Sequence, residues 1–382
     1  MKKNKIYDYI ICGGGQSGLY LAHEMINDSY FNNNKILVIE KSQKNINDRT
    51  WSFWEKGKGK HDDIVIKKWD KAYFSAKNFE INFSMHPYKF KTIQGIDFYN
   101  KIINEINKCN NVDILYTEVI EINKSKELIE VITKENLIRG RKVFSSIYKP
   151  LKNTIQYPLL KQHFIGWFIE TKKNIFNSNK ITFMDFDIPQ KGNTRFMYIL
   201  PFSKNKALIE YTLFSKNLIP ESEYEKEIIN YLEKLNSGNY KILSKEKGII
   251  PMTSYPFWKK NTSNYMNIGT AGGWTKSSTG FTFFKTLKKV NLLINHIKSN
   301  KNLNEFEKKN KYWWYDSLLI DILYKENHLG EYIFKRMFTK NNPKLILRFL
   351  DEKTSLYEDL KFIKTFPIKT FVKAFFSRLS KF

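Results

Sequence analysis

The sequence predicts an α/β protein with a discontinuous dinucleotide-binding Rossmann domain, a β-rich second domain and a helical C-terminal region. Three observations lead to this prediction: a strand–helix–strand pattern with G-x-G-x-x-G spacing near the start, a run of β-prone segments in the middle, and helical periodicity towards the end. A chain of 382 residues can hold two or three domains. We expect residues 1–150 and a returning segment, 265–300, in the nucleotide domain, 151–264 in the substrate domain and 301–382 in the helical region.

The nucleotide domain is predicted from a buried strand, a helix and a second strand, "KILVIE", that ends at Glu40. Gly13, Gly15 and Gly18 occupy the glycine positions between the first strand and the helix. The first glycine permits a tight turn, the second lets a pyrophosphate approach the helix N-terminus, and the third lets helix and strand pack closely. Glu40 is placed to accept a hydrogen bond from a ribose hydroxyl. The pattern therefore predicts a bound dinucleotide.

The position of this fingerprint near the start favours FAD over NAD, because flavoproteins commonly build the flavin site from later, returning segments. The candidate return is "YMNIGTAGGWTKSSTGF" (265–281), a short strand, a glycine-rich turn and then a helix expected from about Thr279. Backbone N–H groups at such a turn can hold a pyrophosphate or a flavin carbonyl. We therefore predict cofactor contacts at Gly269, Gly272, Gly273 and Gly280.

The middle of the chain contains the β-prone segments "HFIGWFIET", "RFMYILPFS" and "KALIEYTLF", which predict a sheet over the cofactor. In the third segment, strand alternation places Glu210 on one face with Leu208 and Phe214, and Tyr211 on the other face. Neither face is hydrophilic, so we expect a buried Glu210 carboxyl group. From the residues alone, an ion pair with a lysine or with Arg195 remains an alternative to a functional acid.

Five segments in order carry a resemblance to a known family: the opening fingerprint, "NDRTWSFWEKG" (47–57), "ALIEYTLFS", "GIIPMTSYPF" and "IGTAGGWTKSSTGF". The chain resembles the lycopene cyclase family of FAD-dependent carotenoid enzymes, with the bacterial β-cyclases of the flavobacterial type nearest. Residues 329–360 also look like that family. Two departures occur: Thr270 stands where many flavoproteins carry aspartate, as it does in these cyclases, and Ser277 replaces the family's usual proline.

The resemblance implies a glutathione-reductase-like fold and a non-redox reaction, the cyclisation of the linear ψ ends of lycopene, or of a related carotenoid, to β-ionone rings. It also implies FAD that must be reduced, with NADPH as a candidate reductant, but that is not consumed. Glu210 lies in the segment that matches the family's acidic motif and is therefore the expected proton donor. An alkene is a weak base, so the donor must stay protonated near neutral pH, as a buried carboxyl group does.

Aromatic side chains are the expected stabilisers of the cation that this reaction forms, at roughly 0.5–2 kcal/mol each. The candidates are Trp51, Trp54, Tyr211 and Trp274, each with ordinary core or cofactor packing as the alternative. Arg49 is expected to face the FAD pyrophosphate, with a surface salt bridge as the alternative.

The net charge of +26 comes mainly from lysine, because only seven of the 64 basic residues are arginines. Nucleic-acid recognition favours arginine, so we expect no nucleic-acid partner. A compositional bias explains the lysines, with an anionic membrane surface as the alternative. Cys12, Cys109 and the six histidines show no ligand or redox spacing, so we predict no metal and a reducing cytoplasm.

The C-terminal segment "IKTFVKAFFSRLSKF" predicts an amphipathic helix. Its apolar stripe contains Ile368, Phe371, Val372, Phe375, Phe376, Leu379 and Phe382, with Lys369, Lys373 and Lys381 largely outside it. This pattern is typical of helices in a bilayer interface, with packing on the protein's own core as the alternative. No segment approaches the roughly 20 apolar residues of a membrane span, and the start lacks a signal-peptide pattern. We expect a cytoplasmic enzyme on the inner face of the cell membrane.

Two other functions are compatible with the sequence. The first is an FAD-dependent monooxygenase or reductase acting on an isoprenoid, because the fold is shared between these reactions. The second is a basic binding module without catalysis, which predicts no tightly bound flavin and tolerance of changes at Glu210.

Overall fold

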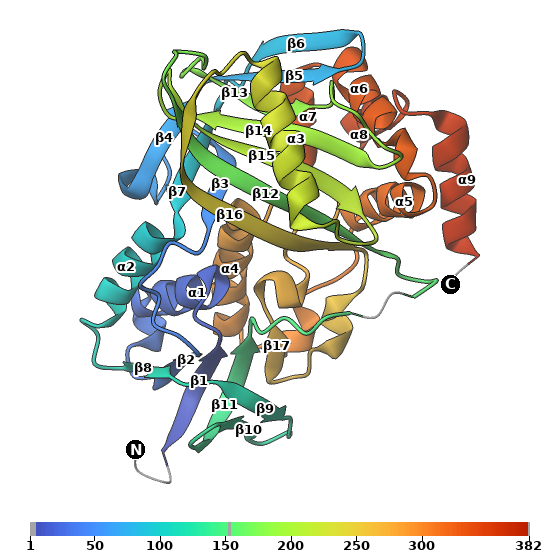
Figure 1. Cartoon of the computed structure of the whole chain (residues 1–382). Coiled ribbons are helices and arrows are strands. Elements are labelled where there is room, and N and C mark those ends of the chain that lie inside the picture. Colours follow the sequence, from blue (N-terminus) through green and yellow to red (C-terminus); the bar gives the residue numbers. More distant parts are fainter. Residues whose placement is uncertain (1–4, 152–153, 381–382) are drawn as a thin grey trace.

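The structure of the protein, a computed structural model, describes residues 5–151 and 154–380 (Figure 1). The predicted basic start, residues 1–4, and the tail residues Lys381 and Phe382 lie outside the described residues. Within the described ranges the strands form two seven-stranded sheets and one three-stranded sheet, with helices packed against the larger sheets. This architecture confirms the predicted fold class.

The first sheet forms the nucleotide half and is parallel at its centre. Its strand β1 pairs in parallel with β2 and β11, and β11 pairs in parallel with β17, so the segment after residue 264 returns to this sheet. The strands lie in the order β8 (Val112–Tyr116), β2 (Ile36–Glu40), β1 (Ile6–Cys12), β11 (Leu137–Ser145), β10 (Ile129–Thr133) and β9 (Val119–Asn123), with β17 (Tyr265–Asn267) beside β11.

Three helices, α1 (Gln16–Ile26), α2 (Gly95–Ile106) and α4 (Phe283–Lys298), pack beside this sheet, with α1 against both others. Helix α4 begins four residues later than the predicted start at Thr279. The reason is local: Gly280 has φ +73°, a left-handed conformation that a helix does not contain. The apolar sides of the helices join the strands in one core, which includes Leu19, Met25, Ile102, Val290 and Leu293.

The second sheet is the large sheet in the upper part of Figure 1. Its strands β12, β14, β15 and β16 are antiparallel neighbours. The order is β16 (Tyr240–Thr253), β12 (Leu159–Thr171), β15 (Lys206–Ser215), β14 (Thr194–Pro201), β13 (Lys180–Asp185), β5 (Lys71–Ala76) and β6 (Phe79–Ser84).

Strands β5 and β6 correct the predicted domain boundary. Residues 71–84 were expected in the nucleotide domain, but β5 pairs in parallel with β13 and extends the second sheet. The packing explains this placement: Phe74 of β5 is fully buried and its ring stacks on Phe338 with centroids 4.0 Å apart. The first 150 residues therefore contribute to both halves of the molecule.

A three-stranded sheet connects the two halves, in the order β3 (Thr50–Lys56), β7 (Tyr88–Gln94) and β4 (Val65–Trp69). The remaining helices surround the second sheet: α3 (Glu221–Lys234), α5 (Lys311–Lys325), α6 (Gly330–Lys340), α7 (Pro343–Leu350), α8 (Leu356–Ile363) and α9 (Ile368–Leu379). Short 3₁₀ segments join these elements at Ser29–Phe31, Asp62–Ile64, Phe257–Lys260, Gly269–Gly272, Leu303–Glu305 and Asn327–Leu329.

The two faces of the second sheet lie in different surroundings. One face packs on α3 through a core that includes Ile165, Met197, Tyr211, Ile228 and Leu232. The other face joins a second core with β5 and the C-terminal helices, which includes Phe74, Phe196, Leu208, Phe214 and Phe334. Successive residues of β14 and β15 therefore alternate between these two cores.

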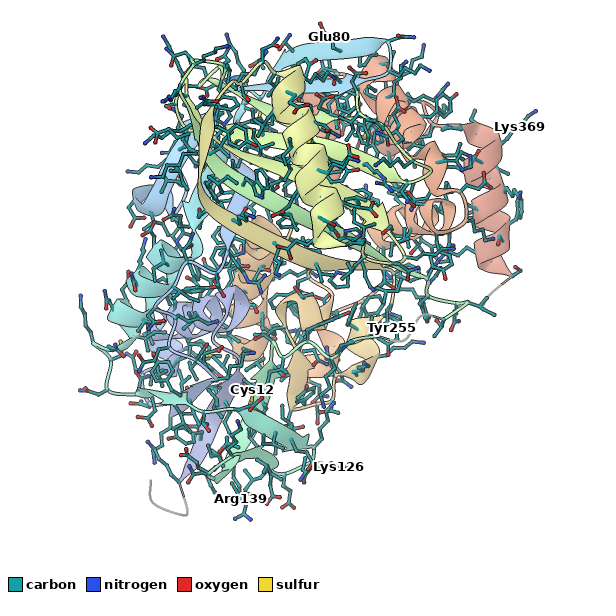
Figure 2. The ribbon with its side chains drawn as sticks, in the orientation of Figure 1. Cys12, Glu80, Lys126, Arg139, Tyr255 and Lys369 are labelled. Atoms are coloured by element: carbon teal, nitrogen blue, oxygen red, sulfur yellow. The ribbon has the colours of Figure 1, made fainter. Side chains whose placement is uncertain are left out.

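Basic side chains lie at the surface of the molecule, in keeping with its net charge of +26. Lys126, Arg139 and Lys369 lie at the periphery of the molecule, whereas Cys12 lies inside the first sheet (Figure 2). Both cysteines are free thiols. Among residues 5–151 and 154–380, none of the helices is long and apolar enough to cross a membrane.

Candidate active site

A cavity of about 1270 Å³ is lined by both halves of the molecule. The glycine turn after β1, Glu40 and the return around Gly269 line it from the nucleotide half. Strands β12, β14, β15 and β16 line it from the second sheet, where its wall is largely aromatic and aliphatic. That wall includes Phe164, Phe183, Phe196, Leu208, Phe214 and Phe334. The cavity therefore joins a nucleotide-type turn to an apolar chamber.

The glycine turn has the geometry that a pyrophosphate requires. Gly13 has φ +102°, and a Cβ there would lie 2.2 Å from Ser146 Oγ. A Cβ on Gly18 would lie 2.0 Å from the carbonyl oxygen of Gly13, so this glycine lets α1 pack on β1. A Cβ on Gly15 would meet no atom within 4 Å, which leaves open space at the N-terminus of α1. An anion can therefore approach the backbone at this point.

Two charged residues lie near this turn. Glu40 is buried at the end of β2, and its Oε2 accepts a 2.6 Å hydrogen bond from the backbone N–H of Gly14. Arg49 also lines the cavity, with 64% of its side chain exposed and its Nε 4.0 Å from Asp48 Oδ2. This long contact leaves the guanidinium group of Arg49 free to bind an anion.

Side-chain oxygens without partners point to a polar ligand in the same cavity. Gln162 Oε1, Thr279 Oγ1 and Thr286 Oγ1 are buried without a hydrogen-bond partner in the described structure, and all three residues line the cavity. Gly280 lies against the first of them, because a Cβ there would come within 2.3 Å of Gln162 Oε1. Together with Gly269, these residues fit FAD, whose ring system carries hydrogen-bond donors and acceptors on a flat apolar body.

Three of the predicted cofactor glycines, Gly18, Gly272 and Gly273, do not line the cavity. A Cβ on Gly272 would lie 2.3 Å from the carbonyl oxygen of Asn267, and one on Gly273, which has φ +75°, would lie 2.7 Å from the Phe257 ring. Both glycines therefore shape the return turn itself. Contact of Gly272 and Gly273 with the cofactor stays a prediction, which the cavity lining does not support.

Three of the four aromatic candidates also lie outside the cavity lining. Trp54 is buried with its ring 4.5 Å from that of Phe281, and Trp274 is buried beside Phe306 in the nucleotide core. Tyr211 projects to the α3 face of the second sheet. Only Trp51 lines the cavity, packed 5.3 Å from Phe283. The aromatic surface of the chamber comes instead from phenylalanines of the second sheet and C-terminal helices.

Glu210 lies in the second sheet with its side chain directed into the cavity. Its main-chain neighbours across the sheet are Gly166 of β12 and Tyr198 of β14, and Gly166 is in turn paired with Glu246 of β16. Four adjacent strands thus present a row of Glu246, Gly166, Glu210 and Tyr198. Glu210 is only 8% exposed, as its sequence predicted.

The structure excludes an ion pair between Glu210 and Arg195. Strand alternation puts the two side chains on opposite faces, and Arg195 Nη1 donates a 3.0 Å hydrogen bond to the hydroxyl oxygen of Tyr211. Burial, followed by the charge and hydrogen bonding of Glu246, raises the pKa of Glu210 well above its ordinary value. These surroundings therefore favour the protonated, neutral form of the Glu210 carboxyl group.

Glu246 was not predicted as a site residue. It lies two positions before the "GIIPM" segment, and burial raises the pKa of its carboxyl group, although contacts with Thr50 and Glu210 act in the opposite direction. Glu246 stands between two lysines, Lys245 and Lys247, so the sequence suggested an exposed charged segment and not a side chain directed into the cavity. The available signal was Gly166, a glycine inside a strand, which often marks a close approach.

Other buried polar groups lie on the far face or in the core. His163 Nδ1 accepts a 2.5 Å hydrogen bond from the Tyr224 hydroxyl, and its Nε2 lies 2.7 Å from Ser215 Oγ, away from the cavity. Burial, followed by the charges of Lys161 and Arg195, lowers the pKa of His163 to about 4. Within the described part of the chain, no cluster of three or more His, Cys, Asp or Glu side chains is placed to hold a metal ion.

Comparison with known proteins identifies relatives of the whole chain. Residues 8–377 match the family described as "Lycopene cyclase protein". None of the curated proteins matches the chain in sequence.

Solved structures with the same fold are flavoproteins and related enzymes. A geranylgeranyl bacteriochlorophyll reductase-like protein from Thermoplasma acidophilum superposes with a TM-score of 0.62 at 12% identity, over 98% of this chain and 99% of that one. A flavoprotein/dehydrogenase from Cytophaga hutchinsonii gives 0.61 at 11% identity, over 99% and 100%. Halogenase PltM in complex with phloroglucinol and FAD gives 0.60 at 10% identity, over 91% and 82%. At these identities the likeness is one of fold.

Proposed function

The chain belongs to the lycopene cyclase family, and we propose that it is a lycopene β-cyclase that converts the linear ψ ends of lycopene, or of a related carotenoid, to β-ionone rings. The observation that carries the proposal is the setting of Glu210. It is a buried carboxyl group against the apolar wall of the cavity, and burial and the neighbouring carboxyl group of Glu246 raise its pKa. A hydrocarbon substrate offers no heteroatom to ionise, so its activation requires such an acid.

Glu210 acts as the general acid of the reaction. Its carboxyl group donates a proton to the terminal C=C bond, which leaves a tertiary carbocation; the C5=C6 bond attacks this cation and closes the ring. Loss of a ring proton then forms the β end. One proton enters and one leaves, so the substrate is isomerised without net oxidation or reduction. The phenylalanine-rich wall excludes water and presents aromatic faces to the cation, including Phe164, Phe183, Phe196 and Phe214.

The nucleotide half fits FAD, which in its reduced form would supply an electron-rich ring that stabilises positive charge nearby. Gly15 leaves the helix N-terminus open to the pyrophosphate, and Arg49 lies at the cavity to pair with it. Glu40 would accept a hydrogen bond from a ribose hydroxyl, and Gly280 would leave room for the ring beside Gln162. The solved complex of a halogenase of the same fold with FAD supports this choice of dinucleotide.

Expression in a lycopene-accumulating bacterium tests the proposal. We expect the red cells to turn orange, with a cyclised pigment of unchanged mass. Glu210→Gln should lower the rate of conversion by about 10²–10⁴-fold, because it removes the proton donor. Tyr211→Phe is the matched control: this neighbour in the sequence lies on the α3 face and should keep the activity.

Two results would contradict the cyclase function. A product that differs in mass from lycopene would identify a monooxygenase or reductase, the chemistry named for some proteins of the same fold. Near-normal conversion by a folded Glu210→Gln protein would remove Glu210 from the role of acid.

A peripheral position on the cytoplasmic face of the membrane is also part of the proposal, because a long hydrocarbon resides in lipid. Helix α9 supports this position, although only one of its sides is available for a membrane contact. Phe371 packs against Phe366, and the buried Arg378 donates a 3.0 Å hydrogen bond to Asp321, so this side holds the helix on the protein. The other side exposes Ile368, Val372, Phe375, Phe376 and Leu379. Exposed apolar side chains beside lysines are typical of a membrane contact.

Substitution of the exposed side chains tests this contact without breaking the buried ion pair. The triple change Ile368→Gln, Val372→Gln and Phe376→Gln should move the protein from the membrane pellet to the supernatant. A triple change of exposed apolar residues elsewhere, Ile120→Gln, Leu137→Gln and Leu243→Gln, is the matched control and should leave sedimentation unchanged. Equal behaviour of the two proteins would contradict the proposal.

A further inference from the structure

Two carboxyl groups approach each other in the cavity because the residue between them, Gly166 of β12, carries no side chain. Gly166 of β12 is paired with Glu210 on one side and with Glu246 on the other. Neighbouring strands are about 4.8 Å apart, so Glu210 and Glu246 start from backbones separated by two such spacings. Their side chains close this distance above Gly166 and are in hydrogen-bonding contact.

Gly166 is required for this contact. A Cβ at this position would lie 2.8 Å from Cγ of Glu210 and 2.9 Å from Cδ1 of Leu208. Any other residue would therefore push the Glu210 side chain away from its position. The backbone of Gly166 is that of an ordinary strand, so conformational freedom does not explain the glycine; the approach of the two carboxyl groups does.

We propose that Glu246 is a positioning residue for the proton transfer: it shares a single proton with Glu210 across Gly166 and thereby keeps Glu210 in its acid form. The inference rests on the proposed cyclase function for its chemical meaning. Two carboxylates in contact cannot both ionise at ordinary cost, because the second negative charge is repelled by the first. A pair of this kind titrates as a unit, with one proton held to higher pH than a lone carboxyl group would hold it.

The surroundings supply no cation to relieve this repulsion. Among the described residues, no lysine or arginine contributes to the shifted pKa of Glu210. The two lysines that flank Glu246 in β16 pair elsewhere, Lys245 with Glu225 and Lys247 with Glu221 at 3.5 Å. Lys161 and Lys216 line the same cavity but act on neither carboxyl group. Tyr198, the titratable group on the other flank of Glu210, has its own pKa raised by burial and by the charge of Glu210.

Strand β3 lies beside the carboxyl pair. Its "TWSFW" segment supplies two hydroxyl groups that contact the row of Glu246, Glu210 and Tyr198. Thr50 directs its hydroxyl group at Glu246 and lowers the pKa of that carboxyl group, without forming a well-shaped hydrogen bond. Ser52, two residues on and on the same side of β3, lies beside the Tyr198 hydroxyl and within 2.8 Å of Thr92 Oγ1. The side chain between them, Trp51, packs on the nucleotide half. This strand thus connects the carboxyl pair to the cofactor half.

The pH dependence of cyclisation by the flavin-loaded protein tests the inference. In Glu246→Gln, the alkaline limb of the rate profile should move to lower pH by about one unit or more, since the like charge is lost. Glu246→Asp keeps the charge and should restore the limb at least in part. The matched control, Glu170→Gln, changes a glutamate of β12 that pairs with Lys206 and should leave the profile unchanged. An unmoved limb in a folded Glu246→Gln protein would overturn the inference.

Infrared difference spectroscopy gives a readout that does not depend on lycopene. In the wild-type holoprotein, a protonated carboxyl band should persist above neutral pH and should disappear in Glu210→Gln. In Glu246→Gln and in Gly166→Ala, the band should titrate at lower pH than in the wild type. If the band behaves in this way but lycopene is not cyclised, the proposed function is contradicted and the inference of a proton-sharing carboxyl pair is supported. If cyclisation occurs without the band, the pair fails and the function stands.

Discussion

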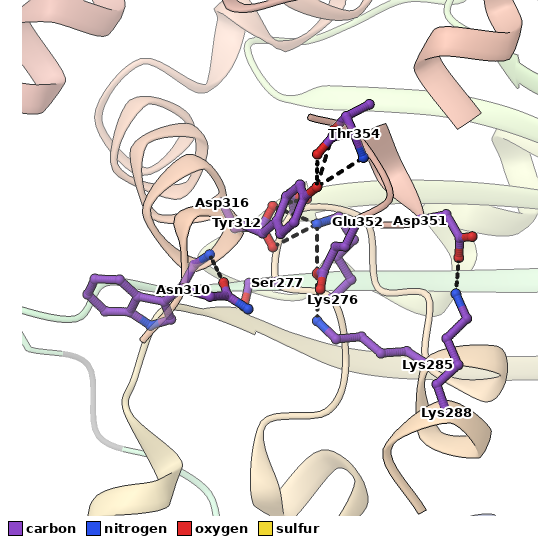
Figure 3. Close-up of polar contacts among 12 residues, drawn as sticks. Lys276, Ser277, Lys285, Lys288, Asn310, Tyr312, Asp316, Asp351, Glu352 and Thr354 are labelled. Carbon is purple, nitrogen blue, oxygen red and sulfur yellow. Dashed lines mark hydrogen bonds and ion pairs between the residues drawn. The ribbon is translucent and has the colours of Figure 1, made fainter. Parts of the chain in front are cut away.

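Two largely buried acidic clusters in this molecule differ in how their surroundings shift the pKa of their carboxyl groups. In the cavity, Glu210 and Glu246 touch each other, and the pKa of both is raised, first by burial. Beside the return turn, Asp316 and Glu352 surround Lys276, with Lys276 Nζ 3.1 Å from both carboxylate oxygens of Asp316 and 3.3 Å from Glu352 Oε1 (Figure 3). Although burial alone would raise the pKa of Glu352, the charges of Lys276 and Lys285 lower it to about 2.

The difference is the presence of a cation, not the depth of burial. Lys276, almost fully buried, has its pKa raised by Asp316 and Glu352 even though burial acts against its charge, and Ser278 Oγ donates a 2.7 Å hydrogen bond to Asp316. This cluster of opposite charges joins the return turn to α5 and the loop after α7 (Figure 3). Among residues 5–151 and 154–380, no lysine or arginine acts in this way on the cavity pair. One cluster is suited to hold the fold together, and the other to release a proton.

The largest expected effect is on stability, at Lys276. Lys276→Met leaves the buried carboxylate of Asp316 without its cation and removes one of the two cations beside Glu352, and it should lower the free energy of unfolding by about 3–5 kcal/mol. Lys285→Met removes a more exposed partner of Glu352 and should cost no more than about 1 kcal/mol. Urea denaturation of both proteins measures the difference. Equal losses would show that the cluster is not a buried network centred on Lys276.

The next effect comes from giving the cavity pair a cation of its own. Thr50→Lys places an ammonium group beside Glu246, which should lower the pKa of both carboxyl groups and reduce cyclisation by about 10²-fold. Thr50→Met adds similar bulk without charge and serves as the control. Kinetic assay of lycopene conversion compares the two proteins; equal activity of the lysine and methionine variants would mean that the missing cation is not what keeps Glu210 protonated.

The smallest expected effect is a difference in the sign of the pH dependence of stability. The pKa of Glu352 falls from 4.5 to about 2 on folding, so its contribution is present above pH 4.5 and is lost as the pH falls towards 2. The pKa of Glu210 rises on folding, so the folded state retains a proton that the unfolded chain releases, and stability decreases as the pH rises above 4.5.

Substitution of each glutamate separates these signs. At about pH 7, Glu352→Gln should destabilise the protein by on the order of 2 kcal/mol, whereas Glu210→Gln should stabilise it by on the order of 1 kcal/mol. Denaturation midpoints at about pH 5 and about pH 7 measure both changes. Destabilisation by Glu210→Gln that grows with pH would contradict the assignment of Glu210 as a neutral acid.

Local patterns in the sequence predicted much of the nucleotide half. The turn at Gly13 and Gly18, the helix after it and the acid at Glu40 are specified by neighbours within a few turns of chain, so spacing alone was sufficient. The same holds for the burial of Glu210, because a strand residue surrounded by apolar neighbours has no exposed face. Arg195 shows the limit of this reasoning: its sequence position allowed an ion pair, and its orientation excludes one.

The sequence by itself determined the class of fold, the glycine turn after β1 and the burial of Glu210. Only the tertiary structure decided that β5 and β6 leave the first 150 residues to join that sheet, that Tyr211 turns to α3, and that Glu246 meets Glu210. The physical reason is that strand neighbours are set by pairing between distant segments. Gly166 precedes Glu210 by 44 residues and Glu246 by 80 residues. No local sequence pattern predicts that these three residues lie next to one another on adjacent strands.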